Sequence, residues 1–333
     1  MSAIFREESA SLDALNGELV GVLGYGNLGR PLAWNMRASG LSVRVGVRDV
    51  TSESQAQALA DGFISDSIER VVQEASVLFL LMPDEALPQA YLDRILPHLT
   101  RRHLLVFASG YNLAFGYIEP PPFVDVGLFA PRCVPSTLRQ RYEEGRGFYS
   151  LVGVGQDANG RVLERVLALA KACGSLKLGA IEVTIEQETE LDLYLQQAVL
   201  PFFTHLLNAS ATLLIDKGYP PEAVLLDLYI SGELNDTIAY AQQEGLLHAL
   251  RNSTMAAQFG FFTRLERYKD LNLERILDQT LKDIRDRSFA DEWAKEYADG
   301  YPRLKRLLRA QETLDLWQTE DDVLHALRRD DAV

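Results

Sequence analysis

A glycine-rich loop near the amino terminus constrains the fold of this chain more than any other feature. Three glycines with the spacing GxGxxG directly follow a short apolar run at residues 19–23. In such a loop the first glycine permits a tight turn, the second admits a pyrophosphate, and the third lets a strand and a helix pack closely. Because the loop follows a predicted strand and opens a predicted helix, it favours a dinucleotide site over a plain glycine turn. The expected cofactor contacts here are Gly24, Tyr25, Gly26, Asn27, Leu28 and Gly29.

The residues after the next predicted strand, 41–47, bear on which dinucleotide binds. An acidic residue at this point is typical of NAD binding, whereas an arginine favours the 2′-phosphate of NADP. Here Arg48 and Asp49 are adjacent. We predict NADPH, because Arg48 and the hydroxyls of Ser52 and Ser54 supply the donors that a phosphate needs. The alternative is a solvated loop in which Asp49 or Ser52 only caps the next helix.

The pattern of apolar residues divides the chain into two parts. Up to Gly179, short apolar runs alternate with amphipathic stretches, which is typical of parallel strands and crossover helices in a doubly wound α/β sheet. The predicted strands are residues 19–23, 41–47, 77–81, 104–107, 124–128 and 148–154, and a helix is expected within 157–174. Beyond Gly179 no glycine occurs until Gly218, and helical periodicity continues. We predict a Rossmann domain at 1–182 and an all-α domain at 183–333.

Composition limits the classes of partner and the compartment. The chain has 47 acidic and 33 basic side chains, a net charge of −14 that works against binding to nucleic acid or to an anionic membrane surface. No uninterrupted apolar run reaches about 18 residues, so we expect no membrane span. The amino terminus lacks a secretory signal, and Cys133 and Cys173 form no disulfide or metal pattern. We therefore expect a cytoplasmic protein, with free thiols, that acts on a small molecule.

Two carboxylates in the second half stand in apolar surroundings. Asp192 and Asp227 are each the only charged residue of an apolar run. Buried carboxylates are costly unless they are paired, protonated or bound to a cation, so both are candidates for metal ligation or acid–base chemistry. Glu188, Asp192 and Gln196 are four residues apart and share one helix face. The alternative is that these acids lie on the polar edges of amphipathic helices or pair with an arginine.

With these residues in view, the chain resembles the ketol-acid reductoisomerase family in its short form. The matching stretches include residues 24–29, 43–48, 83–85, 124–126, 130–131, 156–157, 188–193, 218–219, 257–260 and 289–293. The resemblance implies a Rossmann domain followed by a knotted helical domain that interlocks in a homodimer, with each active site built from both subunits. It also implies NADPH and magnesium as cofactors, and places Pro83, Asp84 and Gly110 at the NADPH site.

Several residues depart from the pattern of this family. The family's histidine before Gly110 is Ser109 here, and its lysine after an alanine–proline pair is Arg132. Its first magnesium aspartate matches Asp192, but the glutamate one turn later is Gln196. The family's substrate-binding serine matches Thr254, which keeps a hydroxyl.

The second pair of magnesium ligands in the family is a pair of glutamates four residues apart. Alignment from one side matches them with Asp227 and Ser231, and alignment from the other side matches them with Tyr229 and Glu233. Mg²⁺ prefers carboxylate and water oxygens, so losing carboxylates weakens the site. We therefore expect magnesium binding to be impaired and the isomerase step to be lost.

Our leading hypothesis from the sequence is an NADPH-dependent reductase of a C=N or C=O bond in a small keto or imino acid. Arg132 would hold the substrate carboxylate through its planar fork. The proton would come from Asp192, Asp227 or Glu233. Thr254 and Ser109 would assist. The first alternative is a genuine magnesium-dependent ketol-acid reductoisomerase that converts acetolactate to a dihydroxy acid, and the second is a non-catalytic nucleotide-binding dimer.

Overall fold

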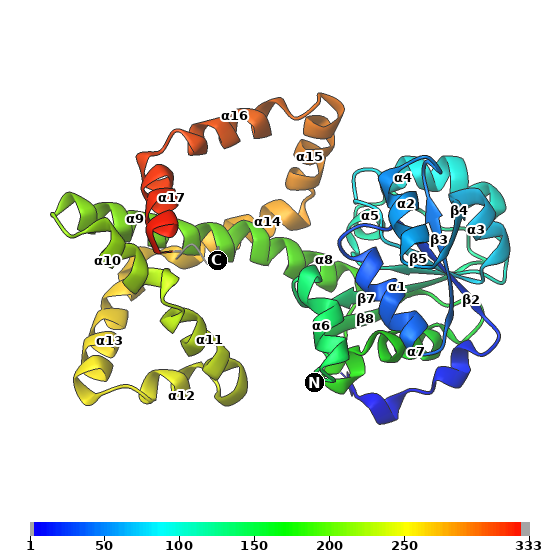
Figure 1. Cartoon of the computed structure of the whole chain (residues 1–333), viewed down its shortest axis with the longest axis horizontal. Coiled ribbons are helices and arrows are strands. Elements are labelled where there is room, and N and C mark those ends of the chain that lie inside the picture. The colour runs from blue at the N-terminus through cyan, green and yellow to red at the C-terminus, as the bar shows by residue number, and fades with distance from the viewer. Residues whose placement is uncertain (1–2, 328–333) are drawn as a thin grey trace, which may run out of the picture. The chain divides into compact units, whose positions relative to one another are not determined.

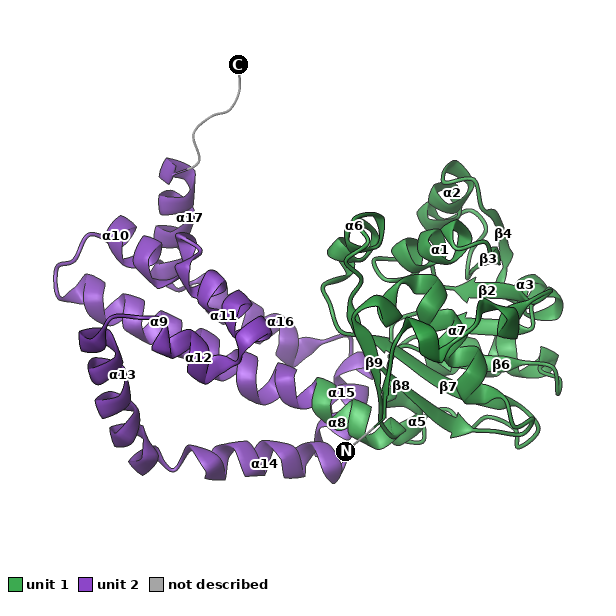
Figure 2. Ribbon diagram, turned by 90° about the horizontal axis from the view of Figure 1, so that it is seen from below, with its two compact units in different colours: residues 1–192 green, residues 193–333 purple. Residues whose placement is uncertain are grey.

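The structure, a computed structural model, describes residues 3–327 of the chain. Contacts divide the chain into two compact units, Met1–Asp192 (unit 1) and Leu193–Val333 (unit 2), which Figure 2 shows in different colours. The division falls within a helix, α8 (Ile185–Tyr194). The domain boundary that we predict near residue 182 lies before this helix and stays a prediction.

Unit 1 is built on a sheet that has nine strands among the described residues, in the order β1-β9-β8-β7-β6-β5-β2-β3-β4 (Figure 1). The strands are β1 Ile4–Phe5, β2 Leu19–Leu23, β3 Ser42–Val47, β4 Ile64–Ser67, β5 Val77–Leu80, β6 Leu104–Phe107, β7 Asp125–Pro131, β8 Tyr149–Gln156 and β9 Gly179–Glu182. All six predicted strands are present. The sequence did not reveal β1, β4 and β9, because they are short and, in β4, mostly polar.

The sheet is mixed, whereas the sequence predicts parallel strands. The strands from β4 across to β7 are parallel, but β8 is antiparallel to β7, and β1 is antiparallel to β9. A parallel connection needs a crossover that spans a face of the sheet. The segment between β7 and β8 carries only a short 3₁₀ turn (Pro135–Thr137) and α6 (Leu138–Glu143), and it returns the chain at the neighbouring position instead.

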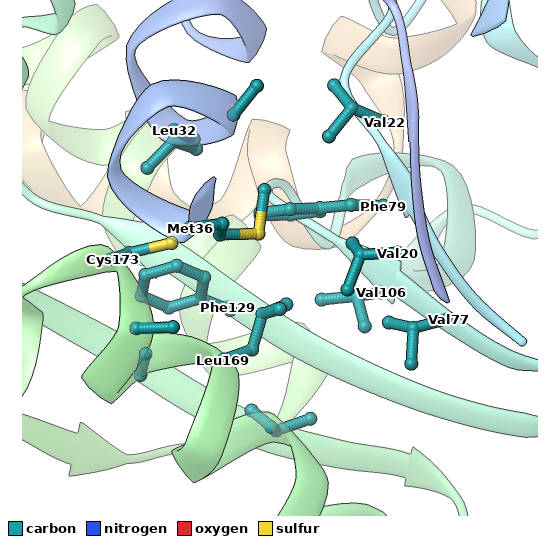
Figure 3. Packing of buried hydrophobic residues seen from close by; sticks show 14 of the residues in the cluster. Val20, Val22, Leu32, Met36, Val77, Phe79, Val106, Phe129, Leu169 and Cys173 are labelled. Carbon is teal, nitrogen blue, oxygen red and sulfur yellow. The ribbon is translucent and has the colours of Figure 1, made fainter. Parts of the chain in front are cut away.

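Two apolar cores cover the two faces of the sheet. Successive side chains of a strand point to opposite faces, so Phe79 lies in one core and Leu78 in the other, and both are fully buried. In the first core Leu32 and Met36 of α1 gather with Phe79 and Phe129 (Figure 3). The helices of unit 1 are α1 Gly29–Ala38, α2 Glu53–Ala60, α3 Ile68–Glu74, α4 Leu87–Ala90, α5 Tyr111–Ala114, α6 and α7 Val162–Cys173, followed by α8. The predicted α/β class is therefore confirmed.

Unit 2 is helical throughout its described residues, as predicted. Its helices are α9 Leu200–Asp216, α10 Pro221–Leu225, α11 Glu233–Glu244, α12 Leu246–Arg251, α13 Met255–Tyr268, α14 Leu273–Arg285, α15 Ser288–Ala298, α16 Pro302–Glu312 and α17 Asp315–Leu327. Two π-helical turns, Leu195–Val199 and Leu226–Ile230, precede α9 and follow α10. The helices diverge instead of packing around one large core (Figure 1), and the core cluster of this unit is small: Ala211, Val224, Leu225 and Val323.

One continuous helical run, Ile185–Asp216, is long and apolar enough to cross a membrane by length and composition alone. Its most apolar window has a mean hydropathy of 1.6, and 11% of that window is buried. One such helix is weak evidence for a membrane span, because a helix that packs against another protein surface passes the same test. The sequence contained this feature, but a search for an uninterrupted apolar run overlooked it.

Candidate active site

The glycine-rich loop connects β2 to α1 and needs glycine at two positions for the fold itself. Gly24 has a φ of +110°, and a Cβ on it would lie 2.8 Å from the carbonyl group of Leu81. A Cβ on Gly29 would lie 2.0 Å from the carbonyl oxygen of Gly24. A Cβ on Gly26 would meet nothing within 4 Å. The structure thus assigns Gly24 and Gly29 to packing and leaves Gly26 as the position where the backbone is open to a ligand.

A cavity of about 710 Å³ lies at the carboxyl ends of β2, β3 and β5. The strand order reverses at β2, which is the point where open α/β sheets bind their ligands. Residues 24–28 of the glycine loop line the cavity together with Arg48, Asp49, Ser52, Ser54, Pro83 and Arg94. The cavity therefore brings together most of the predicted cofactor residues, whereas Gly29, Asp84 and Gly110 lie outside its lining.

Tyr25 contributes backbone to this loop, while its side chain is buried. The Tyr25 hydroxyl donates to Asp61 at 2.8 Å, and Arg30 pairs with the same carboxylate at 2.6 Å. Burial and the neighbouring Asp61 raise the pKa of Tyr25, and the hydrogen bond from Arg30 holds the pKa of Asp61 below its usual value. These contacts fasten the glycine loop to the end of α2, which keeps the loop in place beside the cavity.

In the segment after β3, Ser52 both caps a helix and lines the cavity. The Ser52 hydroxyl accepts a hydrogen bond from the Gln55 amide at 3.3 Å and caps α2, as in the alternative that we considered. Asp49 accepts hydrogen bonds from the amide and hydroxyl of Thr51. Arg48 is exposed, and its guanidinium forms no ion pair with the described residues. Ser52 and Arg48 both still line the cavity.

A group of half-buried and buried polar side chains lies beyond β5 and β6. Asp84 accepts hydrogen bonds from the Ser109 hydroxyl at 3.2 Å and from the Asn112 amide at 3.1 Å. Desolvation by burial raises the pKa of Asp84 to about 6, and the negative charges of neighbouring carboxylates add to the effect. Ser109, at the position of the family's histidine, is therefore part of a hydrogen-bonded pair in which the carboxyl can hold a proton near neutral pH.

Glu188 of α8 joins the loops after β6 and β7. One of its oxygens accepts from the Gly110 amide at 2.7 Å, and the other pairs with Arg132 at 2.6 Å. A Cβ on Gly110 would lie 2.5 Å from the Thr189 hydroxyl oxygen, so only glycine fits at this contact. Burial raises the pKa of Glu188, and the charge of Arg132 opposes that rise. The other side of the Arg132 guanidinium lies 3.6 Å from Asp192.

The remaining predicted site residues belong to unit 2. Gln196 and Asp227 lie on the two π-helical turns, and Glu233 begins α11; all three side chains are exposed. The Thr254 hydroxyl caps α13 by accepting from the Ala257 amide at 3.2 Å. The exposure of Asp227 agrees with the alternative that it lies on the polar edge of a helix. Roles for these residues at an active site stay predictions.

The donor set for a metal is incomplete in one copy of the chain. Within residues 3–327 no group of three or more His, Cys, Asp or Glu side chains is placed to hold an ion. The one predicted ligand on unit 1, Asp192, lies beside the Arg132 guanidinium. The residues of a single chain therefore do not fit the two-ion site that the resemblance implies.

Comparison with known proteins decides the family. Residues 14–179 match the family model described as acetohydroxy acid isomeroreductase, NADPH-binding domain, and residues 185–329 match the model described as ketol-acid reductoisomerase, C-terminal domain. The chain belongs to the ketol-acid reductoisomerase family. The resemblance drawn from the sequence is thus confirmed, as is the prediction of an NADPH-binding Rossmann domain followed by a helical domain.

Relatives in this family match the chain over most of its length. A ketol-acid reductoisomerase (NADP(+)) of Methanocaldococcus jannaschii is 36% identical over 80% of both proteins. A putative ketol-acid reductoisomerase 3 of Saccharolobus solfataricus is 36% identical over 96% of this chain and 97% of its own. The solved structure of an NADH-preferring ketol-acid reductoisomerase from an uncultured archaeon superposes with a TM-score of 0.91 at 28% identity, covering 98% of this chain and 100% of that one.

These relatives correct our functional prediction. We expected a reductase of imino or keto acids that had lost the isomerase step, on the ground of missing carboxylates. Relatives at 34–38% identity are instead named as ketol-acid reductoisomerases, so the findings favour the first alternative. The error came from inferring the loss of a reaction step from the residues that differ at the expected metal site, whereas relatives that match nearly the whole chain carry the name of the complete reaction.

Three residues of unit 1 were missed or undervalued in the sequence. Glu188 was noted for its helix spacing and within a matching stretch but was not predicted as a site residue, yet it is the buried partner of Arg132. Asn112 and Arg94 were not singled out, although Asn112 donates a hydrogen bond to Asp84 and Arg94 lines the dinucleotide cavity. No local motif marks them, because each meets its partner only after strands distant in sequence come together.

Proposed function

We propose that this chain catalyses the ketol-acid reductoisomerase reaction with NADPH. In that reaction an alkyl group migrates within a 2-hydroxy-3-keto acid such as acetolactate. Hydride from NADPH and a proton then convert the new carbonyl to a hydroxyl, giving a dihydroxy acid and NADP⁺. The observation that carries the proposal is the match to relatives of this name over nearly the whole chain, at 36% identity over 96% of its residues in one case.

The side chains of unit 1 offer specific roles in this reaction. The Asp84 carboxyl, with its pKa raised to about 6 and the Ser109 hydroxyl donating to it, lies beside the ends of β5 and β6, where it can exchange a proton with a substrate oxygen. Glu188 fixes the Arg132 guanidinium from a buried position. Arg132 then presents a fixed positive charge for an anionic substrate, in competition with Asp192.

Magnesium, when bound in this family, polarises the ketone and the neighbouring alkoxide. Because the donors of one chain do not fit a two-ion site, we assign no step to a metal and treat Asp192 as its one candidate ligand on unit 1.

We test the proposed function by incubating the protein with NADPH and acetolactate, with magnesium in one arm and EDTA in the other. The proposal expects NADPH oxidation matched mole for mole by the rearranged dihydroxy acid, identified by NMR, because the rearranged and unrearranged products are isomers of the same mass. Oxidation of NADPH with only the unrearranged reduction product would overturn it in favour of a simple reductase. Tight NADPH binding without turnover in either arm would overturn it in favour of a binding protein.

We further propose that the chain works as a homodimer in which unit 2 of each copy covers the other. Large apolar side chains are exposed along α9 and α13, among them Phe202, Phe203, Leu206 and Phe259, the last at 72%. Exposed apolar surface on this scale marks an interface. Light scattering after size exclusion should give twice the monomer mass, and a monomer at micromolar concentration would contradict the proposal. We also propose that the helical domain is knotted and that the protein is cytoplasmic.

A further inference from the structure

Arg94 lies at the dinucleotide cavity on a π-helical turn, Tyr91–Ile95, which follows α4. Tyr91 and Ile95 are buried and anchor the turn in the core, while the Arg94 side chain is 37% exposed. Single π-helical turns are often found at functional sites, because the extra residue redirects neighbouring side chains. This turn, which follows β5 and α4 in the chain, places Arg94 at the same cavity as the glycine loop and Arg48.

Two contacts hold the Arg94 guanidinium in a defined orientation. Its Nη1 donates to the carbonyl oxygen of Arg48 at 2.6 Å, and its Nε lies 3.6 Å from a carboxylate oxygen of Glu69. Among the described residues, no hydrogen bond uses Nη2. The guanidinium is thus tied to the backbone of Arg48, with one donor edge left for a ligand in the cavity.

The charges that line the cavity require a second cation. Its charged residues, among those described, are Arg48, Asp49 and Arg94. Hydrogen bonds from Thr51 hold the pKa of Asp49 below its usual value, with the charge of Arg94 adding to the effect, so Asp49 is ionised at neutral pH. Without Arg94 the charges of Arg48 and Asp49 would cancel. A phosphate monoester brings nearly two negative charges, which a neutral pocket does not attract.

We propose that Arg94 is a second cation for the 2′-phosphate of NADPH and, beside Arg48, a residue that determines the preference for NADPH over NADH. This inference rests on the proposed use of NADPH. Arg48 reaches the phosphate from the end of β3, and Arg94 reaches it from the π-helical turn. Two guanidinium groups from different elements bind a phosphate more selectively than one, because each donates charge-assisted hydrogen bonds in a fixed direction.

The test compares binding of ADP with binding of ADP that carries an added 2′-phosphate, by isothermal titration calorimetry. Arg94→Gln should weaken binding of the 2′-phosphorylated ligand roughly tenfold or more, the scale of one charge-assisted hydrogen bond, and leave ADP binding within about twofold. Arg94→Lys should retain part of the affinity. Added salt should weaken binding of the 2′-phosphorylated ligand less in Arg94→Gln than in the unaltered protein.

Arg70→Gln is the matched control, since Arg70 is an exposed arginine of the same unit that pairs with Glu74 and does not line the cavity. It should bind both ligands as the unaltered protein does, and thermal melting should show that each variant is folded. An equal loss for both ligands in Arg94→Gln would overturn the inference and place Arg94 against the adenosine. Unchanged binding would overturn it as well. Equal affinity of the unaltered protein for both ligands would instead refute the proposed preference for NADPH.

Discussion

At the scale of single residues, the candidate site depends on how two carboxyl groups are partnered. Glu188 has a guanidinium and a backbone amide as partners, so its negative charge is compensated. Asp84 has only the neutral donors of Ser109 and Asn112, and none of the described residues forms an ion pair with it. Desolvation therefore dominates at Asp84 and raises the pKa of its carboxyl to about 6, well above that of an ordinary aspartate.

The raised pKa of Asp84 predicts a pH dependence of stability. Its value of about 6 in the folded protein lies above that of an unfolded aspartate, so folding favours the protonated form. Stability from this group is complete below pH ~4 and is lost as the pH rises through about 6. Asp84→Asn should remove that loss. Urea unfolding should show the variant gaining about 1–2 kcal/mol relative to the unaltered protein between these limits, after allowance for solvent at this half-buried carboxyl.

Glu119→Gln is the control for this prediction, since it removes one negative charge from an exposed side chain of the same unit that forms no hydrogen bond with Asp84. Its stability should follow the same pH profile as the unaltered protein. If the difference in the free energy of unfolding between Asp84→Asn and the unaltered protein does not change across this pH range, the pKa of the Asp84 carboxyl is not raised.

The buried pairing of Glu188 predicts a loss of stability that an exposed neighbour does not cause. Glu188→Ala should lower the free energy of unfolding by about 2–4 kcal/mol, because the Gly110 amide and the Arg132 guanidinium lose their partner and a cavity remains. Glu186→Ala, on the exposed side of the same helix, should cost less than about 0.5 kcal/mol. Similar losses in both variants, measured by urea unfolding, would contradict the role given to Glu188.

At the scale of elements, the β2–α1 connection separates the needs of the fold from those of the ligand. Gly24 and Gly29 are required because atoms of this chain occupy the space where a side chain would lie. Gly26 has that space free, and it lines the cavity. The same three-glycine pattern therefore has two physical causes, and substitution can distinguish them.

We predict that alanine substitutions in this loop affect different measurements. Gly29→Ala should lower the melting temperature by several degrees, since its Cβ would overlap the Gly24 carbonyl and force the strand and helix apart. Gly26→Ala should leave the melting temperature nearly unchanged and weaken NADPH binding roughly tenfold or more, because the methyl group enters the space reserved for the pyrophosphate. Gly26→Ala that binds NADPH normally would place the cofactor elsewhere. Calorimetric melting and NADPH fluorescence titration are the two measurements.

At the scale of the whole molecule, the two units differ in how completely each buries its apolar residues. Unit 1 has two extensive cores on the faces of its sheet, whereas the main core cluster of unit 2 centres on four buried residues. A chain region of this length that exposes phenylalanines along its helices obtains much of its stability from whatever covers them. The proposed homodimer supplies that cover.

This difference predicts that the stability of unit 2 depends on protein concentration. Raising the concentration a hundredfold should raise the melting temperature, because dissociation accompanies unfolding of a dimer. Phe203→Asp should shift the protein toward monomer and abolish the concentration dependence. Asp157→Ala, which replaces an exposed residue of unit 1, should leave the dimer and its concentration dependence unchanged. A melting temperature independent of concentration, with a monomer mass throughout, would contradict the dimer.

The sequence by itself determined those features of the fold that depend on a single segment of the chain. The glycine spacing, the alternation of apolar strands and helices, and the change to continuous helical periodicity gave the Rossmann unit, the helical unit and the place of the cofactor loop. Such features depend on backbone sterics and on burial within one element, so a single segment carries them. The same rules placed Arg48, Ser52 and Ser54 near the dinucleotide, and the structure finds all three lining one cavity.

Only the tertiary structure decided which side chains from distant segments meet. The antiparallel β8, the clamp of Glu188 on Arg132 and the approach of Arg94 to Arg48 each join residues that are far apart in the chain. Charge and hydrogen bonding act over a few ångströms in space, so no spacing rule along the sequence can supply these contacts. The prediction of the reaction, in contrast, was corrected by the relatives that match nearly the whole chain, and not by any contact within it.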